Sequence, residues 1–195
     1  HTSSALTSSP IPKRVMQTWE HKQLNPEFQA IADTWKTHNP HYEFVLMDAA
    51  EREQFIRAHF ERSVITAYQQ IVPGAYKSDL FRYCYLWVNG GVYVDIDTLC
   101  LGSLDDFLTP GVELVVPIDL NLSANEGTHN LACGFIAAVP RHPAMMRCIQ
   151  KIVRNVETGT VPGSKLDFSG PGILGRAVNE CLHRGETASF VGNEG

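Results

Sequence analysis

Two aspartates, Asp95 and Asp97, are the residues whose type and spacing most directly suggest chemistry. They alternate with the apolar Val94 and Ile96, and strict alternation is typical of a strand. On one strand the two carboxylates would project from the same side, roughly 6.6 Å apart along it. Paired carboxylates closing an apolar strand are costly unless a cation compensates their charge. Mg2+ and Mn2+ accept such oxygen ligands together with substrate phosphates, so the pair predicts a divalent-metal site.

Asp95 and Asp97 also have a simpler interpretation, as strand-end residues that cap a turn. An isolated Asp-x-Asp is a weak signal, so the motif by itself leaves both interpretations open. The metal interpretation has a chemical consequence, because a divalent cation held by the two carboxylates would stabilise charge on a departing phosphate. The segments on either side help to decide between the two.

A helix is expected just before the two aspartates. Ser78 can cap its N-terminus, which would place Asp79 in the first turn. The sequence Asn89-Gly90-Gly91 ends the helix, because glycine adopts the positive φ that terminates helices. Tyr93, on the following strand, is expected to be a packing residue. The buried face of the helix recurs at helical spacing and consists of Leu80, Tyr83, Cys84 and Trp87.

Asp79 and Arg82 lie three residues apart and therefore on one face of this helix. They could form a simple pair there, worth about 0.2–0.5 kcal/mol. They could instead bind a substrate, since the fixed charge and forked donors of arginine match the oxygens of phosphates. Spacing alone leaves both interpretations open.

Strand and helix patterns alternate along the chain, which predicts an α/β fold with a mostly parallel central sheet. Trp19 follows the first strand, at the edge where open α/β sheets bind ligands, so it could stack on a base. An ordinary core tryptophan is the alternative. Strands are expected at 13–18, 42–47, 112–117 and 131–139, and helices at 25–39, 49–60 and 64–71, with two more after Pro143 and Pro171.

Length and composition fit one globular domain. Of the 195 residues, 1–10 form a Ser/Thr-rich stretch expected to be a flexible tail, and 11–195 are expected to form a single domain. A net charge of −5 without a basic run argues against nucleic acid as a partner. No apolar stretch approaches the roughly 18 residues that span a bilayer. The five dispersed cysteines are expected to be buried thiols, and the polar stretch 120–130 a flexible loop.

Several motifs occur in a fixed order along the chain. Ile11 to Trp19 reads I-P-K-R-V-M-Q-T-W, 77–83 reads K-S-D-L-F-R-Y, and 86–97 reads L-x-x-x-G-G-V-Y-x-D-x-D, before Leu104-Asp105. Together they resemble glycosyltransferase family 32, the retaining, nucleotide-sugar-dependent enzymes that include yeast-type Golgi mannosyltransferases. That family is related to the catalytic domains of clostridial glucosylating toxins. The resemblance covers 11–106 well and 131–143 loosely.

The resemblance implies a GT-A type, Rossmann-like nucleotide-sugar-binding domain that transfers a hexose with retention at the anomeric carbon. It also implies a catalytic group in which Asp97 binds Mn2+ or Mg2+ directly. Asp95 would bind the ribose, the metal through water, or both. Asp79 and Arg82 would hold the donor sugar, with Arg82 also near the phosphates. The nucleotide pocket would include Gln17, Thr18 and Trp19, with the Trp19 ring on the base.

The family favours GDP-mannose over a UDP-hexose as donor and a glycan, glycolipid or protein as acceptor. It also implies the Golgi or secretory lumen, while a cytoplasmic location stays open. Ser169-Gly170-Pro171 resembles the family's T-G-P turn at the edge of the active site. Cys133, however, stands where asparagine is usual, which weakens a donor-contact role for this residue. The family's late histidine-containing motif is not found, so a third protein metal ligand and part of the phosphate clamp are unassigned. A catalytically impaired sugar-nucleotide-binding protein is therefore the alternative.

Overall fold

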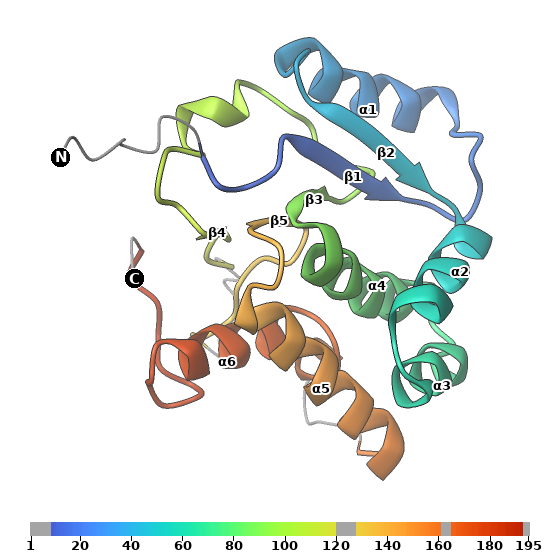
Figure 1. The fold of residues 1–195 in the computed structure, drawn as a ribbon, viewed down its shortest axis with the longest axis vertical. Helices are drawn as coiled ribbons and strands as arrows, with labels where there is room; N and C mark the ends of the chain where they lie inside the picture. Colours follow the sequence, from blue (N-terminus) through green and yellow to red (C-terminus); the bar gives the residue numbers. More distant parts are fainter. Residues whose placement is uncertain (1–8, 120–127, 161–164, 193–195) are drawn as a thin grey trace, which may run out of the picture.

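A computed structural model describes residues 9–119, 128–160 and 165–192 (Figure 1). The first eight residues of the expected tail and 120–127 of the expected loop lie outside the described residues. At the centre is a five-stranded sheet in the order β2-β1-β3-β5-β4. Its strands are β1 (Arg14–Thr18), β2 (Glu43–Met47), β3 (Gly91–Val94), β4 (Leu114–Val115) and β5 (Phe135–Ala138).

The sheet is mostly parallel, as predicted. β1 runs parallel to β2 and to β3, whereas β5 runs antiparallel to both β3 and β4. Four strands therefore point one way and β5 points the other. As a consequence, the start of β5 lies at the same sheet edge as the carboxyl ends of β1 and β3. The expected strands at 112–117 and 131–139 are shorter in the structure, because ladder pairing extends only over the bounds of β4 and β5.

Helices cover both faces of the sheet (Figure 1). Val15 and Met16, neighbours on β1, point to opposite faces and join different apolar clusters. Trp35 of α1 packs in the Val15 cluster, and the larger Met16 cluster draws on the helices of the other face. The helices are α1 (Pro26–His38) on the first face and α2 (Ala49–His59), α3 (Arg62–Gln70), α4 (Gly74–Asn89), α5 (Pro143–Thr158) and α6 (Pro171–Cys181) on the second.

Helix α4 differs from its predicted form at its start. It begins at Gly74, directly after Pro73, so Ser78 is not its cap and Asp79 is not in its first turn. The Lys77 amide donates to the Pro73 carbonyl at 3.1 Å, which shows that the helical ladder is already in place before Ser78. The end is as predicted: Gly90 has a φ of 61°, and a Cβ there would lie 2.6 Å from the backbone nitrogen of Pro140.

The Asp-x-Asp segment is not a strand, which corrects the prediction for Asp95 and Asp97. β3 ends at Val94, and the Thr98 amide donates to the Asp95 carbonyl at 3.1 Å to close a turn. Strand pairing explains the difference, because the ladder with β5 covers only Gly91 to Val94 and that with β1 only Val92 and Tyr93. The two carboxylates therefore leave the chain from a turn rather than from one side of a strand.

Candidate active site

The site forms at the sheet edge where β1 and β3 end and β5 begins. The Asp95 amide donates to the Gly134 carbonyl at 2.9 Å, which ties the end of β3 to the residue before β5. The Gln17 side chain reaches the same point from β1, donating from Nε2 to the Asp95 carbonyl at 3.4 Å. The backbone of Asp95 is thereby held by both neighbouring strands.

The Asp95 carboxylate is held through one oxygen and open through the other. Its Oδ1 accepts from the Tyr93 hydroxyl at 2.7 Å and lies 3.4 Å from Nη2 of Arg82. No hydrogen bond from the described residues reaches Oδ2, although a Cβ on Gly134 would lie only 2.7 Å from it. The side chain is 38% exposed, so it combines a fixed orientation with access to a ligand.

Arg82 connects the two acidic residues that the sequence placed in one group. Its Nη2 lies 2.9 Å from Oδ1 of Asp79 and 3.4 Å from Oδ1 of Asp95. The guanidinium also donates to the carbonyls of Ser78 and Cys133, and it lies 4.4 Å from the centre of the Tyr93 ring. Asp79 and Arg82 are 8% and 4% exposed, so theirs is a buried pair and not the surface pair that spacing allowed.

Asp79 receives a second partner from a distant part of the chain. The Ser169 hydroxyl, itself fully buried, donates to Oδ2 of Asp79 at 2.6 Å. Asn155 of α5 holds the turn before Ser169, because its Nδ2 donates to the Phe168 carbonyl at 3.0 Å. The serine of the S-G-P turn is therefore in contact with Asp79, one of the expected site residues.

The electrostatics of this cluster keep Arg82 charged. Burial raises the pKa of Asp79, and the neighbouring Arg82 and Ser169 oppose that rise. Burial alone would lower the pKa of Arg82, but Tyr93 and Asp79 raise it well above its ordinary value. Burial likewise raises the pKa of Tyr93 well above its usual range, so Tyr93 stays a hydroxyl donor to Asp95. The cluster carries a fixed cation between two carboxylates.

Cys133 occupies the position at which the family usually has asparagine. Its backbone carbonyl accepts from Arg82, and its Sγ lies 3.9 Å from Oδ1 of Asp79. Burial raises the pKa of Cys133 to about 12, so it is a neutral thiol at physiological pH and not a nucleophile. All five cysteines are free, in agreement with the expected thiols.

Asp95 and Asp97 are the residues that could hold a metal ion together with a substrate. Asp97 is exposed, and no hydrogen bond or ion pair from the described residues reaches its carboxylate. Together with Oδ2 of Asp95 it offers two carboxylate ligands. The described residues hold no cluster of three or more His, Cys, Asp or Glu side chains able to bind a metal ion. Mg2+ commonly takes one or two carboxylates and the phosphates of a substrate, so this donor set fits such an ion.

The expected nucleotide-pocket residues divide into one exposed ring and two buried supports. Trp19 is 37% exposed and packs edge-to-face on Phe28 of α1, with ring centres 4.9 Å apart. It is therefore not a core tryptophan. Gln17 and Thr18 are 7% and 5% exposed, and the Thr18 hydroxyl donates to the Met47 carbonyl at 2.7 Å. These two side chains bond to protein groups rather than face solvent.

Three residues at the site escaped the sequence analysis. Tyr93 was expected only to pack, although its place two residues before Asp95 puts both on one side of the chain. Ser169 was visible as part of a motif, but its partner Asp79 is distant in sequence. Arg52 of α2 gave no signal at all. It is 1% exposed and donates to the Trp19 carbonyl at 3.0 Å.

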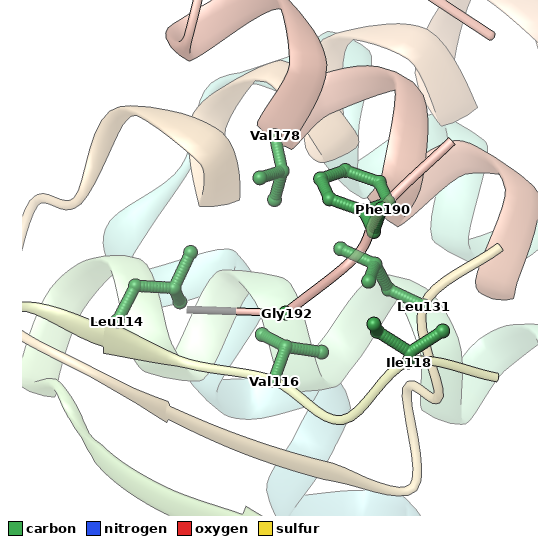
Figure 2. Close-up of a pocket in the computed structure, with 7 residues that line it drawn as sticks. All are labelled: Leu114, Val116, Ile118, Leu131, Val178, Phe190 and Gly192. Carbon is green, nitrogen blue, oxygen red and sulfur yellow. The ribbon is translucent and has the colours of Figure 1, made fainter. Parts of the chain in front are cut away.

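A separate apolar pocket lies between the β4 edge and α6 (Figure 2), with a volume of about 90 Å³. No charged or hydrogen-bonding side chain lines it, and none of the expected site residues contributes to it. It therefore lacks the groups that a nucleotide sugar requires. Its lining residues are Leu114, Val116, Ile118, Leu131, Val178, Phe190 and Gly192.

Comparison with known proteins agrees with the motifs and the fold. The family described as "Glycosyltransferase sugar-binding region containing DXD motif" matches residues 25–111, which include Asp79, Arg82, Asp95 and Asp97. The initiation-specific alpha-1,6-mannosyltransferase of Candida albicans is 31% identical over 52% of this chain and 28% of its own length. The enzyme of the same name from Schizosaccharomyces pombe is 25% identical over 89% of this chain and 49% of its own. The chain thus spans half or less of these relatives.

The fold has a counterpart among solved structures. The PaToxG glycosyltransferase superposes with a TM-score of 0.73 at 17% identity, over 90% of this chain and 71% of that one. The glycosyltransferase domain of the YGT toxin superposes with a TM-score of 0.63 at 10% identity, over 94% and 81%. At these identities the likeness establishes the GT-A fold and no more. Residues 25–111 thus match the glycosyltransferases whose sugar-binding region contains a DXD motif, which confirms the resemblance to glycosyltransferase family 32.

Proposed function

We propose that this chain transfers a hexose with retention, in a metal-dependent reaction, from a nucleotide-sugar donor to a glycan, lipid or protein acceptor. The observation that carries the proposal is the position of Arg82, which joins the carboxylates of Asp79 and Asp95, two residues before the exposed Asp97. A structural ion pair would not require a second carboxylate with a free oxygen and a third that is open to solvent.

Each residue of the cluster has a proposed task. Asp97 and Oδ2 of Asp95 would hold Mn2+ or Mg2+, which when bound supplies positive charge for the diphosphate leaving group. Asp79 would accept a hydrogen bond from a donor-sugar hydroxyl, with Ser169 and Arg82 fixing its orientation. Arg82, which stays cationic, would add to the field on the phosphates. Tyr93 orients Asp95 through its hydroxyl.

The nucleotide is proposed to lie at the carboxyl end of β1. The exposed ring of Trp19 would stack on the base, supported by Phe28 beneath its edge. Gln17 and Thr18 would act indirectly, because their side chains hydrogen-bond to the backbone that forms the pocket. No carboxylate is assigned as a covalent nucleophile. Transfer from the front face of the sugar needs no such residue, so it is the reaction course that the assigned residues allow.

GDP-mannose is the favoured donor, since the two relatives described above are mannosyltransferases by name, and a UDP-hexose is the second choice. The acceptor class is left as a glycan, glycolipid or protein. A secretory-lumen location is proposed from the family resemblance alone. No helix in the described part of the chain is long and apolar enough to cross a membrane.

Turnover of the donor tests the proposal. The protein is incubated with Mn2+ and GDP-mannose or UDP-glucose, with a simple glycoside and water as the possible acceptors, and proton NMR follows the donor and the anomeric configuration of the released or transferred sugar. We expect one donor to be consumed, with the α configuration kept, and no consumption in EDTA. Nucleotide binding without consumption of either donor would favour the second candidate, a catalytically impaired sugar-nucleotide-binding protein. The observation behind this candidate is that the described residues supply no cluster of three metal-binding side chains.

A further inference from the structure

A second buried arginine lies outside the carboxylate cluster, at the end of β1. Arg52 projects from α2, and its side chain is only 1% exposed, whereas its ion-pair partner Glu20 is 51% exposed. A buried guanidinium is costly to desolvate unless most of its donors find partners. Here the partners are concentrated in a single short segment of chain.

Arg52 bonds to three consecutive residues, 18 to 20. Its Nη1 donates to the Thr18 hydroxyl at 2.8 Å and to the Trp19 carbonyl at 3.0 Å. Its Nη2 donates to Oε1 of Glu20 at 2.7 Å. Its Nε donates to the Tyr68 hydroxyl of α3 at 3.1 Å, which fixes the plane of the guanidinium. The arginine therefore clamps the turn that follows β1 against α2 and α3.

This clamp controls the direction of the Trp19 side chain. The Trp19 amide donates to the Met47 carbonyl at 3.2 Å, and its carbonyl accepts from Arg52. With the peptide groups on both sides fixed, the Cα–Cβ bond of Trp19 has a set direction, and the ring meets Phe28 edge-on. Trp19 is thus an exposed ring on a rigid support, although it lies beyond the end of the strand.

We propose that Arg52 is a positioning residue that holds the Trp19 ring ready to stack on the base of the nucleotide. The inference rests on the proposed function, since it assumes that Trp19 contacts the nucleotide. Arginine suits the task because its planar fork addresses several acceptors at once, whereas a lysine in its place keeps the charge but not the fork. Preorganisation of this kind raises affinity by reducing the ordering that binding requires.

The test uses Arg52→Lys in protein labelled with 5-fluorotryptophan. The Trp19 resonance is identified by its absence from a labelled Trp19→Phe variant. In Arg52→Lys we expect the fluorine resonance of Trp19 to shift and broaden while those of Trp35 and Trp87 keep their positions. The dissociation constant for a nucleoside diphosphate with Mn2+ should rise about tenfold or more.

Two further variants separate positioning from stability. Ile149→Ala removes a buried side chain of α5 and serves as a control of lowered melting temperature; it should leave the Trp19 resonance and the affinity unchanged. Tyr68→Phe removes the acceptor of Nε and should give a smaller change of the same kind, which keeps the test valid if Arg52→Lys does not fold.

The outcomes distinguish this inference from the proposed function. An unchanged Trp19 resonance in folded Arg52→Lys or Tyr68→Phe would overturn the positioning role, and so would an equal effect of Ile149→Ala. Failure of the wild-type protein to bind any nucleoside diphosphate would instead overturn the proposed function, while the Trp19 resonance would still report on the clamp.

Discussion

Arg82 is the residue on which the cluster depends most. It is buried and has two carboxylates and two carbonyls as acceptors. Removing one partner of a buried pair leaves the other as an uncompensated charge, and this typically costs about 3–5 kcal/mol. Arg82 therefore compensates the charge of Asp79 in the fold, in addition to its proposed role in binding the donor.

Replacing Arg82 by methionine should produce a pH-dependent loss of stability. Burial already raises the pKa of Asp79, and losing Arg82 raises it further. When folding raises the pKa of a carboxyl, the stability that this group contributes is fully present at pH values below its pKa in the unfolded chain. That contribution is lost as the pH rises through its pKa in the folded protein. We therefore expect the free energy of unfolding to be about 3 kcal/mol lower than in wild type at neutral pH. This difference should shrink toward about pH 4. Urea unfolding measures it, and a deficit that does not change with pH would contradict this account.

Asp97→Asn should separate the proposed metal site from the fold. Because Asp97 is exposed and carries no bond from the described residues, the melting temperature should stay within about 1 °C of wild type. Manganese-dependent affinity for a nucleoside diphosphate should fall about tenfold or more. Asp106→Asn, an exposed aspartate of the short 3-10 helix Leu104–Asp106, is the matched control. Equal affinities of the two variants would show that Asp97 does not bind the metal.

At the scale of elements, the turn after β3 and the start of β5 shape the site together. Gly134 lies so close to Oδ2 of Asp95 that a Cβ would stand 2.7 Å from it. Gly134→Ala should therefore displace the Asp95 carboxylate and weaken metal-dependent nucleotide binding several-fold. Gly102→Ala is the control, since no atom lies within 4 Å of a Cβ there. Calorimetry compares the two; unimpaired binding by Gly134→Ala would show that the position of Oδ2 is unimportant.

A second element-scale contact holds the 3-10 helix against the sheet. Asp105 accepts hydrogen bonds from Lys13, His41 and Tyr42. Partial burial would raise the pKa of Asp105, but these three donors outweigh it and lower that pKa to about 2. A carboxyl with a lowered pKa stabilises the fold above its unfolded pKa of 3.8 and loses this effect as pH falls through about 2.

Asp105→Asn should accordingly lower the melting temperature at neutral pH, and the difference from wild type should vanish near pH 2. Asp106→Asn again serves as the control, because it lies in the same 3-10 helix. Thermal unfolding followed by circular dichroism measures both. A constant difference between Asp105→Asn and wild type across this pH range would contradict the assignment of the ion pairs.

The sequence predicted elements well where a local signal ends them. Asn25, where the helix expected at 25–39 begins, caps α1 by accepting from the Phe28 amide at 2.8 Å, and Gly90 ends α4 as expected. The sequence predicted less well the elements whose ends depend on other parts of the structure. The alternation through Asp97 suggested a longer β3, but the extent of β3 matches its pairing with β5, which ends at Val94. Ser78 resembled a cap, yet α4 had already started after Pro73.

At the scale of the whole molecule, the sheet brings together residues that are far apart in the chain. The carboxyl ends of β1 and β3 and the start of β5 share one edge, so Trp19, Asp95 and Gly134 belong to one region. The family motifs named most of the expected site residues from sequence. The contacts among them could not be predicted, because the Asp79–Ser169 bond joins residues 90 positions apart and Arg52 belongs to no motif.

Calorimetric titration with GDP and with UDP, each in Mn2+ and in EDTA, tests the central claim most directly. The proposed site predicts that one of the two nucleotides binds in Mn2+, that binding is lost in EDTA, and that Asp97→Asn also loses it. Binding of neither nucleotide, or binding that is equal in Mn2+ and in EDTA, would contradict the assignment of this sheet edge as a metal-dependent nucleotide-sugar site.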